Sequence, residues 1–93
     1  MGRMRVLVTR IEGEGAMQRR MVDTARQADC ARWEDLTARA LAFLPPYRPV
    51  PGAAIYHVCV DGHMVIVVAE HDLAGPLLDL VTAVLALGDA PGG

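Results

Sequence analysis

The dipeptide Asp61-Gly62 separates two runs rich in β-branched and aromatic residues, at positions 54–60 and 63–70. Asp-Gly readily supplies the positive backbone angles of a two-residue hairpin turn, and this pair between two such runs is the strongest short-range hairpin signal. The second half of the chain therefore predicts an antiparallel hairpin. A two-residue turn places Val60 opposite His63, Cys59 opposite Met64 and Val58 opposite Val65.

This register divides the hairpin side chains between two faces, because successive residues of a strand point to opposite sides. We predict that the more apolar face packs in the core; its members are Tyr56, Val58, Val60, Val65, Val67 and Ala69. The opposite face is half apolar, which is unusual for a solvated surface. We interpret three of its residues, Met64, Ile66 and Val68, as a candidate surface for self-association.

The first half of the chain predicts a second hairpin. Residues 4–10 alternate in polarity, and Gly13 and Gly15 then permit a tight return. Residues 16–24 form the returning strand, and both of its faces are mixed. Arginines on such a strand are typical of a sheet edge that is protected from pairing with other chains.

Two amphipathic segments predict helices. Asp29 is placed to cap a helix that begins near Cys30 and ends before Pro45-Pro46. Its apolar stripe consists of Trp33, Leu36, Ala40, Phe43 and Leu44. A second helix begins near Pro76 and stops at Gly88. Residues 45–52 contain four prolines and predict a stiff loop without ladder hydrogen bonds.

The predicted order is ββαββα, an α+β fold with a four-stranded antiparallel sheet and two helices packed on one face. With 93 residues the chain makes a single domain, residues 1–93, with its core over 4–87 and a disordered tail at 88–93. A composition of 53% hydrophobic and 22% charged residues excludes a disordered chain. No apolar run reaches the ~20 residues of a membrane span, and the first residues lack the apolar segment of a secretory signal. We therefore expect a cytoplasmic protein without a membrane partner.

The sequence offers no convincing catalytic or metal site. It has no Ser and no Lys, which excludes a Ser nucleophile and a Schiff-base Lys. His57, Cys59 and Asp61 alternate along one strand, but three ligands in a row do not converge on one ion. Cys30 begins a helix, where a thiol pKa can be lowered. We expect Cys30 and Cys59 to be reduced structural thiols, and we expect no cofactor, no metal and no enzymatic activity.

The basic residues also give no nucleic-acid signature. Arginines cluster on the first hairpin, which lacks the aromatic side chains that stack on single-stranded bases. The net charge of -2 points the same way. A small module without catalytic residues and without nucleic-acid features favours a protein partner.

The ordered segments of the chain resemble the emfourin family, small bacterial proteins that inhibit thermolysin-like (M4) metalloproteases. The resemblance covers residues 4–87. Its segments are RVLVTR at 5–10, RRMVD at 19–23, Trp33 with Leu36, PPYRPVPG at 45–52, IYHVCVDG at 55–62 and the apolar helix pattern over 73–85. The first turn departs from the family, because Glu12-Gly13-Glu14-Gly15 lacks the aromatic residue found there. The skew toward Ala, Gly, Pro, Arg and Val is typical of a GC-rich bacterium.

The resemblance implies an inhibitor that blocks substrate access to the cleft of a zinc protease. Such a protein must present a rigid loop, because a preorganised loop binds at a lower entropic cost. The candidate contacts are Ile11, Glu12, Gly13, Glu14, Gly15, Tyr47 and Arg48. A carboxylate, from Glu12 or Glu14, is placed to approach the protease zinc or cationic groups beside it. The zinc belongs to the protease. The alternative is a non-catalytic interaction module or homodimer that uses the half-apolar sheet face.

Overall fold

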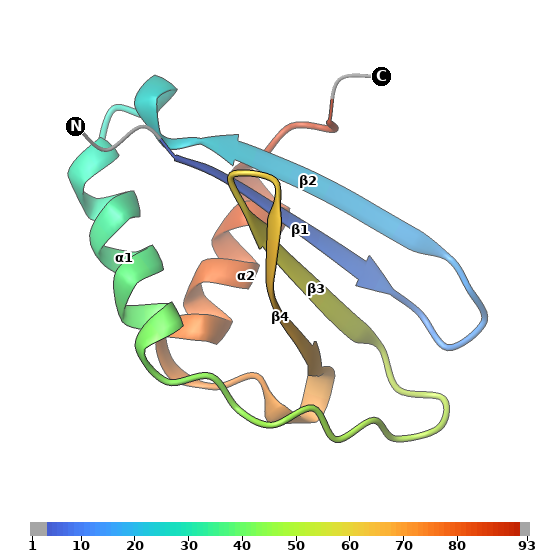
Figure 1. Ribbon diagram of the computed structural model, residues 1–93. Coiled ribbons are helices and arrows are strands. Elements are labelled where there is room, and N and C mark those ends of the chain that lie inside the picture. Colours follow the sequence, from blue (N-terminus) through green and yellow to red (C-terminus); the bar gives the residue numbers. More distant parts are fainter. Residues whose placement is uncertain (1–3, 92–93) are drawn as a thin grey trace.

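The computed structural model of the protein describes residues 4–91 (Figure 1). The element order ββαββα is as predicted. The elements are β1 (Arg5–Ile11), β2 (Met17–Asp23), the short 3-10 helix η1 (Thr24–Arg26), α1 (Cys30–Ala42), β3 (Ile55–Val60), β4 (His63–Ala69), the 3-10 helix η2 (Glu70–Asp72) and α2 (Gly75–Leu87).

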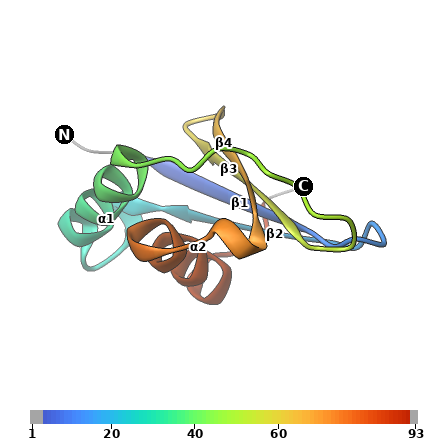
Figure 2. The ribbon, with the colours of Figure 1, turned by 90° about the horizontal axis from the view of Figure 1, so that it is seen from below.

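The four strands form one antiparallel sheet in the order β2-β1-β3-β4. The first strands of the two hairpins, β1 and β3, therefore pair with each other at the centre of the sheet. Both helices lie against the same side of this sheet, and the other side carries no helix (Figure 2). The predicted α+β architecture with helices on one face is confirmed.

The core lies between the sheet and the two helices. From β1 it takes Val6 and Val8, both 0% exposed, while Leu7 between them is only half-buried. From α2 it takes the fully buried Leu80 and Val84. Trp33 enters the same cluster from α1 and is 9% exposed. Burial alternates from Arg5 to Val8, as expected when one face of a sheet is covered, and Thr9 on the other side is also buried, at 7% exposed.

The β3–β4 hairpin turns at Asp61 and Gly62, which have φ angles of 51° and 83°. Val60 pairs with His63 and Cys59 with Met64, as predicted. Val58, however, pairs with Ile66 rather than Val65, because the register shifts between Val58 and Cys59 and leaves Val65 as an extra residue of β4.

The added residue reverses the predicted faces of β4. Ile66 and Val68 are buried in the core, whereas Val65 and Val67 are only half-buried. A shift of one residue moves every side chain of a strand to the other face. The prediction that Val65 and Val67 belong to the core face together with Tyr56 is therefore wrong for β4.

Helix α1 ends at Ala42, earlier than the predicted apolar stripe requires. Phe43 has an extended backbone, with φ -134° and ψ 96°, and it is 88% exposed. Leu44 is 44% exposed and precedes Pro45, whose ring disfavours a helical conformation in the residue before it. The prediction that Phe43 and Leu44 join the helical core stripe is wrong.

The residue after Gly88 pairs with the outer strand of the sheet. Asp89 and Met21 exchange two backbone hydrogen bonds of 2.8 and 2.9 Å. The tail predicted to be disordered over 88–93 thus begins beside β2, and residues 92–93 lie outside the described part of the chain. Within residues 4–91, neither helix has the length and apolarity of a membrane span.

Candidate functional site

The turn between β1 and β2 is a short, hydrogen-bonded projection. Glu12 donates its backbone N–H to the Ala16 carbonyl at 2.8 Å, and Gly15 donates to the Glu12 carbonyl at 2.9 Å. Gly15 has a φ of 95°, a conformation that glycine adopts without strain. The tip of the turn, from Gly13 to Gly15, is exposed. These two bonds hold the tip in a defined shape.

The proline-rich loop, residues 43–54, runs beside this turn. A Cβ added to Gly13 would lie 2.9 Å from the Gly52 carbonyl oxygen, so the two backbones are in direct contact. A groove of about 480 Å³ lies between the turn and the loop, lined among others by Ile11, Glu12, Val50 and Pro51. We name the turn (residues 12–15) and the proline-rich loop together the loop edge.

A polar network fixes the base of the turn. Arg10, at the end of β1, donates to the Tyr56 hydroxyl at 2.9 Å, and it is ion-paired with Glu12 and, at 3.4 Å, with Glu70. The Tyr56 hydroxyl donates in turn to Glu70 at 3.2 Å. Hydrogen bonds to Tyr56 and then Glu12 hold the pKa of Arg10 above its ordinary value. The network ties β1, β3 and η2 together beneath the loop edge.

The two carboxylates proposed to approach a protease zinc differ in their surroundings. Glu12 is paired with Arg10, which compensates its charge. Glu14 is exposed at the tip and has no partner among residues 4–91. The sequence left this choice open. The structure makes Glu14 the carboxylate that projects, and Glu12 a residue that helps to hold the turn.

The second pair of predicted contact residues, Tyr47 and Arg48, lies on the proline-rich loop. Arg48 donates to Asp72 of η2 at 2.8 Å, and the Asp72 side chain is only 8% exposed. Arg48 therefore anchors the loop to the body of the protein. Tyr47 is 47% exposed and remains available for contact.

The loop also exposes apolar side chains that the sequence analysis did not single out as contacts. Phe43, Leu44 and Val50 are 88%, 44% and 48% exposed, and Tyr47 lies between them in sequence. Exposed apolar residues gathered on one segment are typical of a protein-binding surface. The signal that could have found Phe43 and Leu44 is Pro45, which ends the helix before them.

The candidate self-association surface is not present as predicted. Met64 is 55% exposed, but Ile66 is 8% and Val68 is 0% exposed, because the irregularity in β4 turns both into the core. The three residues do not form an exposed face, and this prediction is wrong.

The thiols and histidines are not arranged for catalysis or metal binding. Asp61 accepts a hydrogen bond from the backbone N–H of Arg5 at 2.9 Å. Burial and the nearby Glu34 carboxylate raise the pKa of the Cys30 thiol, so its position at the start of a helix does not lower it. Within the described part of the chain, no three residues among His, Cys, Asp and Glu are placed to share a metal ion.

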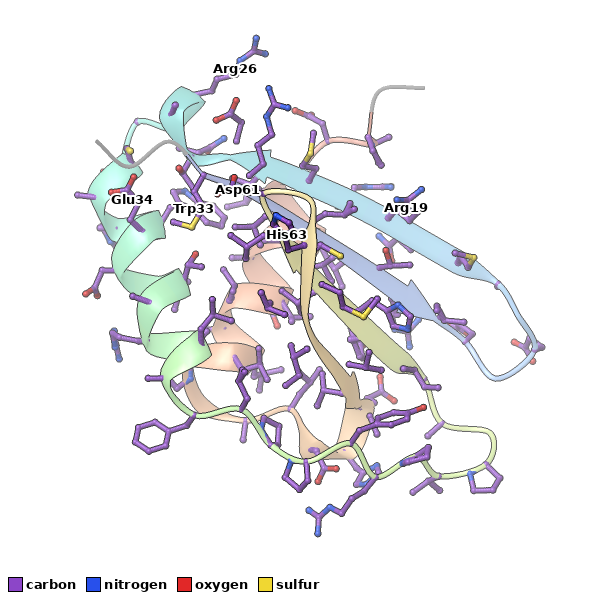
Figure 3. The ribbon with its side chains drawn as sticks, in the orientation of Figure 1. Arg19, Arg26, Trp33, Glu34, Asp61 and His63 are labelled. Atoms are coloured by element: carbon purple, nitrogen blue, oxygen red, sulfur yellow. The ribbon has the colours of Figure 1, made fainter. Side chains whose placement is uncertain are left out.

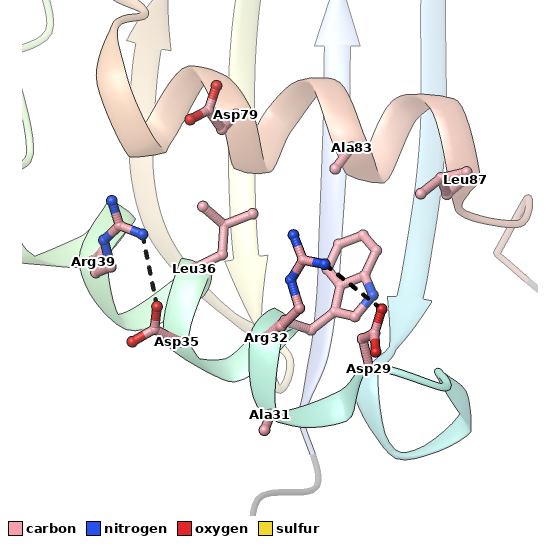
Figure 4. A pocket seen from close by; sticks show the side chains of 10 residues that line it. Asp29, Ala31, Arg32, Asp35, Leu36, Arg39, Asp79, Ala83 and Leu87 are labelled. Carbon is pink, nitrogen blue, oxygen red and sulfur yellow. Dashed lines mark ion pairs between the residues drawn. The ribbon is translucent and has the colours of Figure 1, made fainter.

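A second groove, of about 710 Å³, lies between α1 and α2 (Figure 4). Trp33, Leu36, Ala83 and Leu87 contribute its apolar wall. The basic residues at its rim lie near acids of their own segment: Arg32 lies 3.9 Å from Asp29, which precedes α1, and Arg39 lies 3.6 Å from Asp35 within α1. These are solvated local pairs and point to no ligand.

No protein-family model matches the chain, and comparisons with the curated proteins and with the solved structures returned no match.

Proposed function

We propose that the protein inhibits a thermolysin-like (M4) zinc metalloprotease by placing the loop edge across the substrate cleft. The observation that carries this proposal is the contact between Gly13 and Gly52, which joins two loops into one projection. A projection that is already ordered loses little conformational entropy on binding.

The described contacts suggest a role for each part of the loop edge. Glu14 supplies an uncompensated carboxylate at the tip, suited to the zinc or to a cationic group beside it. Tyr47 and Val50 supply apolar contact area next to it. Arg10 and Arg48 hold the turn and the loop in place through their bonds to Tyr56 and Asp72. In this proposal the protein acts by binding to the protease.

The experiment is a titration of thermolysin, and of an M4 protease from the same source organism, while hydrolysis of a peptide substrate is followed. We expect activity to fall in proportion to added protein until one equivalent is bound. Absence of inhibition of both proteases at about 100-fold excess over enzyme would overturn the proposal.

Two matched variants test the assigned roles. Glu14→Gln removes the projecting charge and is expected to weaken inhibition about tenfold or more, since a charge-assisted contact is lost. Asp35→Asn makes the same change on the outer surface of α1 and is expected to leave inhibition unchanged. If both variants inhibit like the parent protein, the tip carboxylate does not contact the protease.

A further inference from the structure

The sheet side opposite the helices is a continuous, largely apolar surface. Val6 and Val8 point into the core, so Leu7, Thr9 and Ile11 point to the other side. The strand registers place the neighbours of these residues on the same side. We name this surface the open face; it comprises Arg5, Leu7, Thr9, Ile11, Met17, Arg19, Met21, Asp23, Ile55, His57, Cys59, Asp61, Met64 and Val67. Figure 2 shows that no helix covers it.

The open face is banded across the strands. One row is apolar and consists of Met21, Leu7, Cys59 and Met64. The next is mixed and consists of Arg19, Thr9, His57 and Val67. The third is apolar again and includes Met17, Ile11 and Ile55. The remaining row, at the opposite end of β1, holds Arg5 with Asp23 at 3.9 Å, and Asp61 beside them. Figure 3 shows Arg19 on β2, and Asp61 and His63 at the β3–β4 turn.

We propose that the open face docks on the open face of a second copy of this chain, around a two-fold axis parallel to the strands. With this axis, β1 of one copy faces β3 of the other, and β2 faces β4. Each row of one copy then faces the same row of the other copy. Apolar rows then meet apolar rows, as in a sandwich of two aligned sheets about 10 Å apart. A two-fold axis across the strands that brings the two apolar rows together passes through the mixed row, and it would place the two Arg19 side chains directly opposite each other.

The charges of the face fit the same axis. Arg5 lies on β1, and Asp61 follows β3 at the same level, so each Arg5 meets Asp61 of the second copy. Arg19 lies on the outer strand β2, where no acid pairs with it among residues 4–91. The axis carries the two Arg19 residues to opposite margins, about 14 Å apart across the sheet, beyond the screening length of about 10 Å. The two Arg19 charges therefore do not oppose the association.

The size of the face sets the expected strength. Four strands about 4.8 Å apart and seven residues at about 3.4 Å each give about 450 Å² per copy. Two copies would bury about 900 Å², which is below the ~1,200 Å² of stable specific interfaces and within the range of weak, transient ones. We therefore expect a weak, reversible dimer with a dissociation constant of about 10–100 μM.

The first test is sedimentation equilibrium between about 1 and 500 μM, a range that spans the expected dissociation constant. The parent protein is expected to pass from monomer to dimer. Leu7→Arg places a charge against an apolar row and should raise the dissociation constant about tenfold or more. Leu78→Arg makes the same change at an exposed position of α2 and should leave it unchanged. Far-UV circular dichroism establishes that both variants fold.

A second test uses the parent protein alone, because Cys59 lies within the open face. Alkylation of Cys59, followed by peptide mass spectrometry, should slow as the dimer forms, while Cys30 at the start of α1 serves as the reference in the same sample. A parent protein that stays monomeric over the whole range overturns the proposal. So does a dimer that forms without slowing the alkylation of Cys59, since it would use another surface.

Discussion

Arg10 connects parts of the chain that lie far apart in sequence. Its guanidinium reaches Tyr56, 46 positions later, and Glu70, 60 positions later, as well as its near neighbour Glu12. A tyrosine hydroxyl that both accepts from Arg10 and donates to Glu70 makes the cluster cooperative. Sequence patterns do not indicate such a cluster, because it depends on the β1–β3 pairing.

The value of this cluster can be measured by removing one hydroxyl. Tyr56→Phe is expected to lower the free energy of unfolding by about 1–2 kcal/mol, since two hydrogen bonds to charged groups are lost from a partly buried site. Tyr47→Phe removes the same atom from an exposed residue and should change stability by less than about 0.5 kcal/mol. Urea denaturation measures both. Equal effects of the two substitutions would mean that the hydrogen bonds of the Tyr56 hydroxyl do not stabilise the folded protein.

The thiol of Cys30 provides a test that depends on pH. Its pKa is raised, first by burial and then by Glu34, whose carboxylate accepts the S–H at 3.5 Å. Less thiolate is present at a given pH below that pKa, so alkylation of Cys30 at about pH 8 should be slower than that of a free cysteine. Glu34→Gln should shift the pH–rate profile of Cys30 back toward lower pH. If the alkylation rate of Cys30 in the parent protein rises at the same pH as that of a free thiol, or at a lower pH, this account is contradicted.

At the scale of elements, β4 shows where sequence analysis stops being decisive. Its two alternating sets, Val65 with Val67 and Ile66 with Val68, are equally apolar. Either set satisfies a core, so polarity cannot choose the register, and one added residue decides it. The Asp-Gly turn, the presence of two helices and the order of the elements along the chain carried stronger local signals and were predicted correctly.

A matched pair of substitutions tests the register of β4 directly. Val68→Ala is expected to cost about 2 kcal/mol of unfolding free energy, because two methyl groups leave a fully buried site. Val67→Ala removes the same groups from a half-buried site on the open face and should cost less than about 1 kcal/mol. The reverse order of the two losses, measured in urea, would support the register without the added residue.

At the scale of the whole molecule, one core joins the four strands and both α-helices. Trp33 reaches this core from α1 and is the only tryptophan of the chain. Its fluorescence therefore reports the packing of the helices, while far-UV circular dichroism reports the sheet and helices together.

We expect both signals to change in one cooperative transition with the same midpoint, as in other small single domains. The measurement is a urea titration that records fluorescence and circular dichroism on the same samples. Midpoints that differ beyond the error of the fit would mean that α1 separates from the sheet before the strands come apart.

The candidate site was predictable only in part at this scale. The glycine turn and the proline-rich segment were recognisable as stiff loops, but their contact through Gly13 and Gly52 requires the folded chain. Nothing in the amino-acid sequence indicates that Arg48 pairs with Asp72, or that Glu12 pairs with Arg10. These pairs decide which predicted contacts are free to meet a partner.

The central pairing of β1 with β3 also has a consequence in time. Each hairpin closes locally, but the seam between them joins residues such as Val8 and Val58 across the whole first half of the chain. Pairings of such sequence separation form late, since a long loop must close first. During synthesis, β1 must therefore wait for β3 to emerge before the sheet can be completed, and until then the apolar inner face of the first hairpin is exposed to whatever the nascent chain meets.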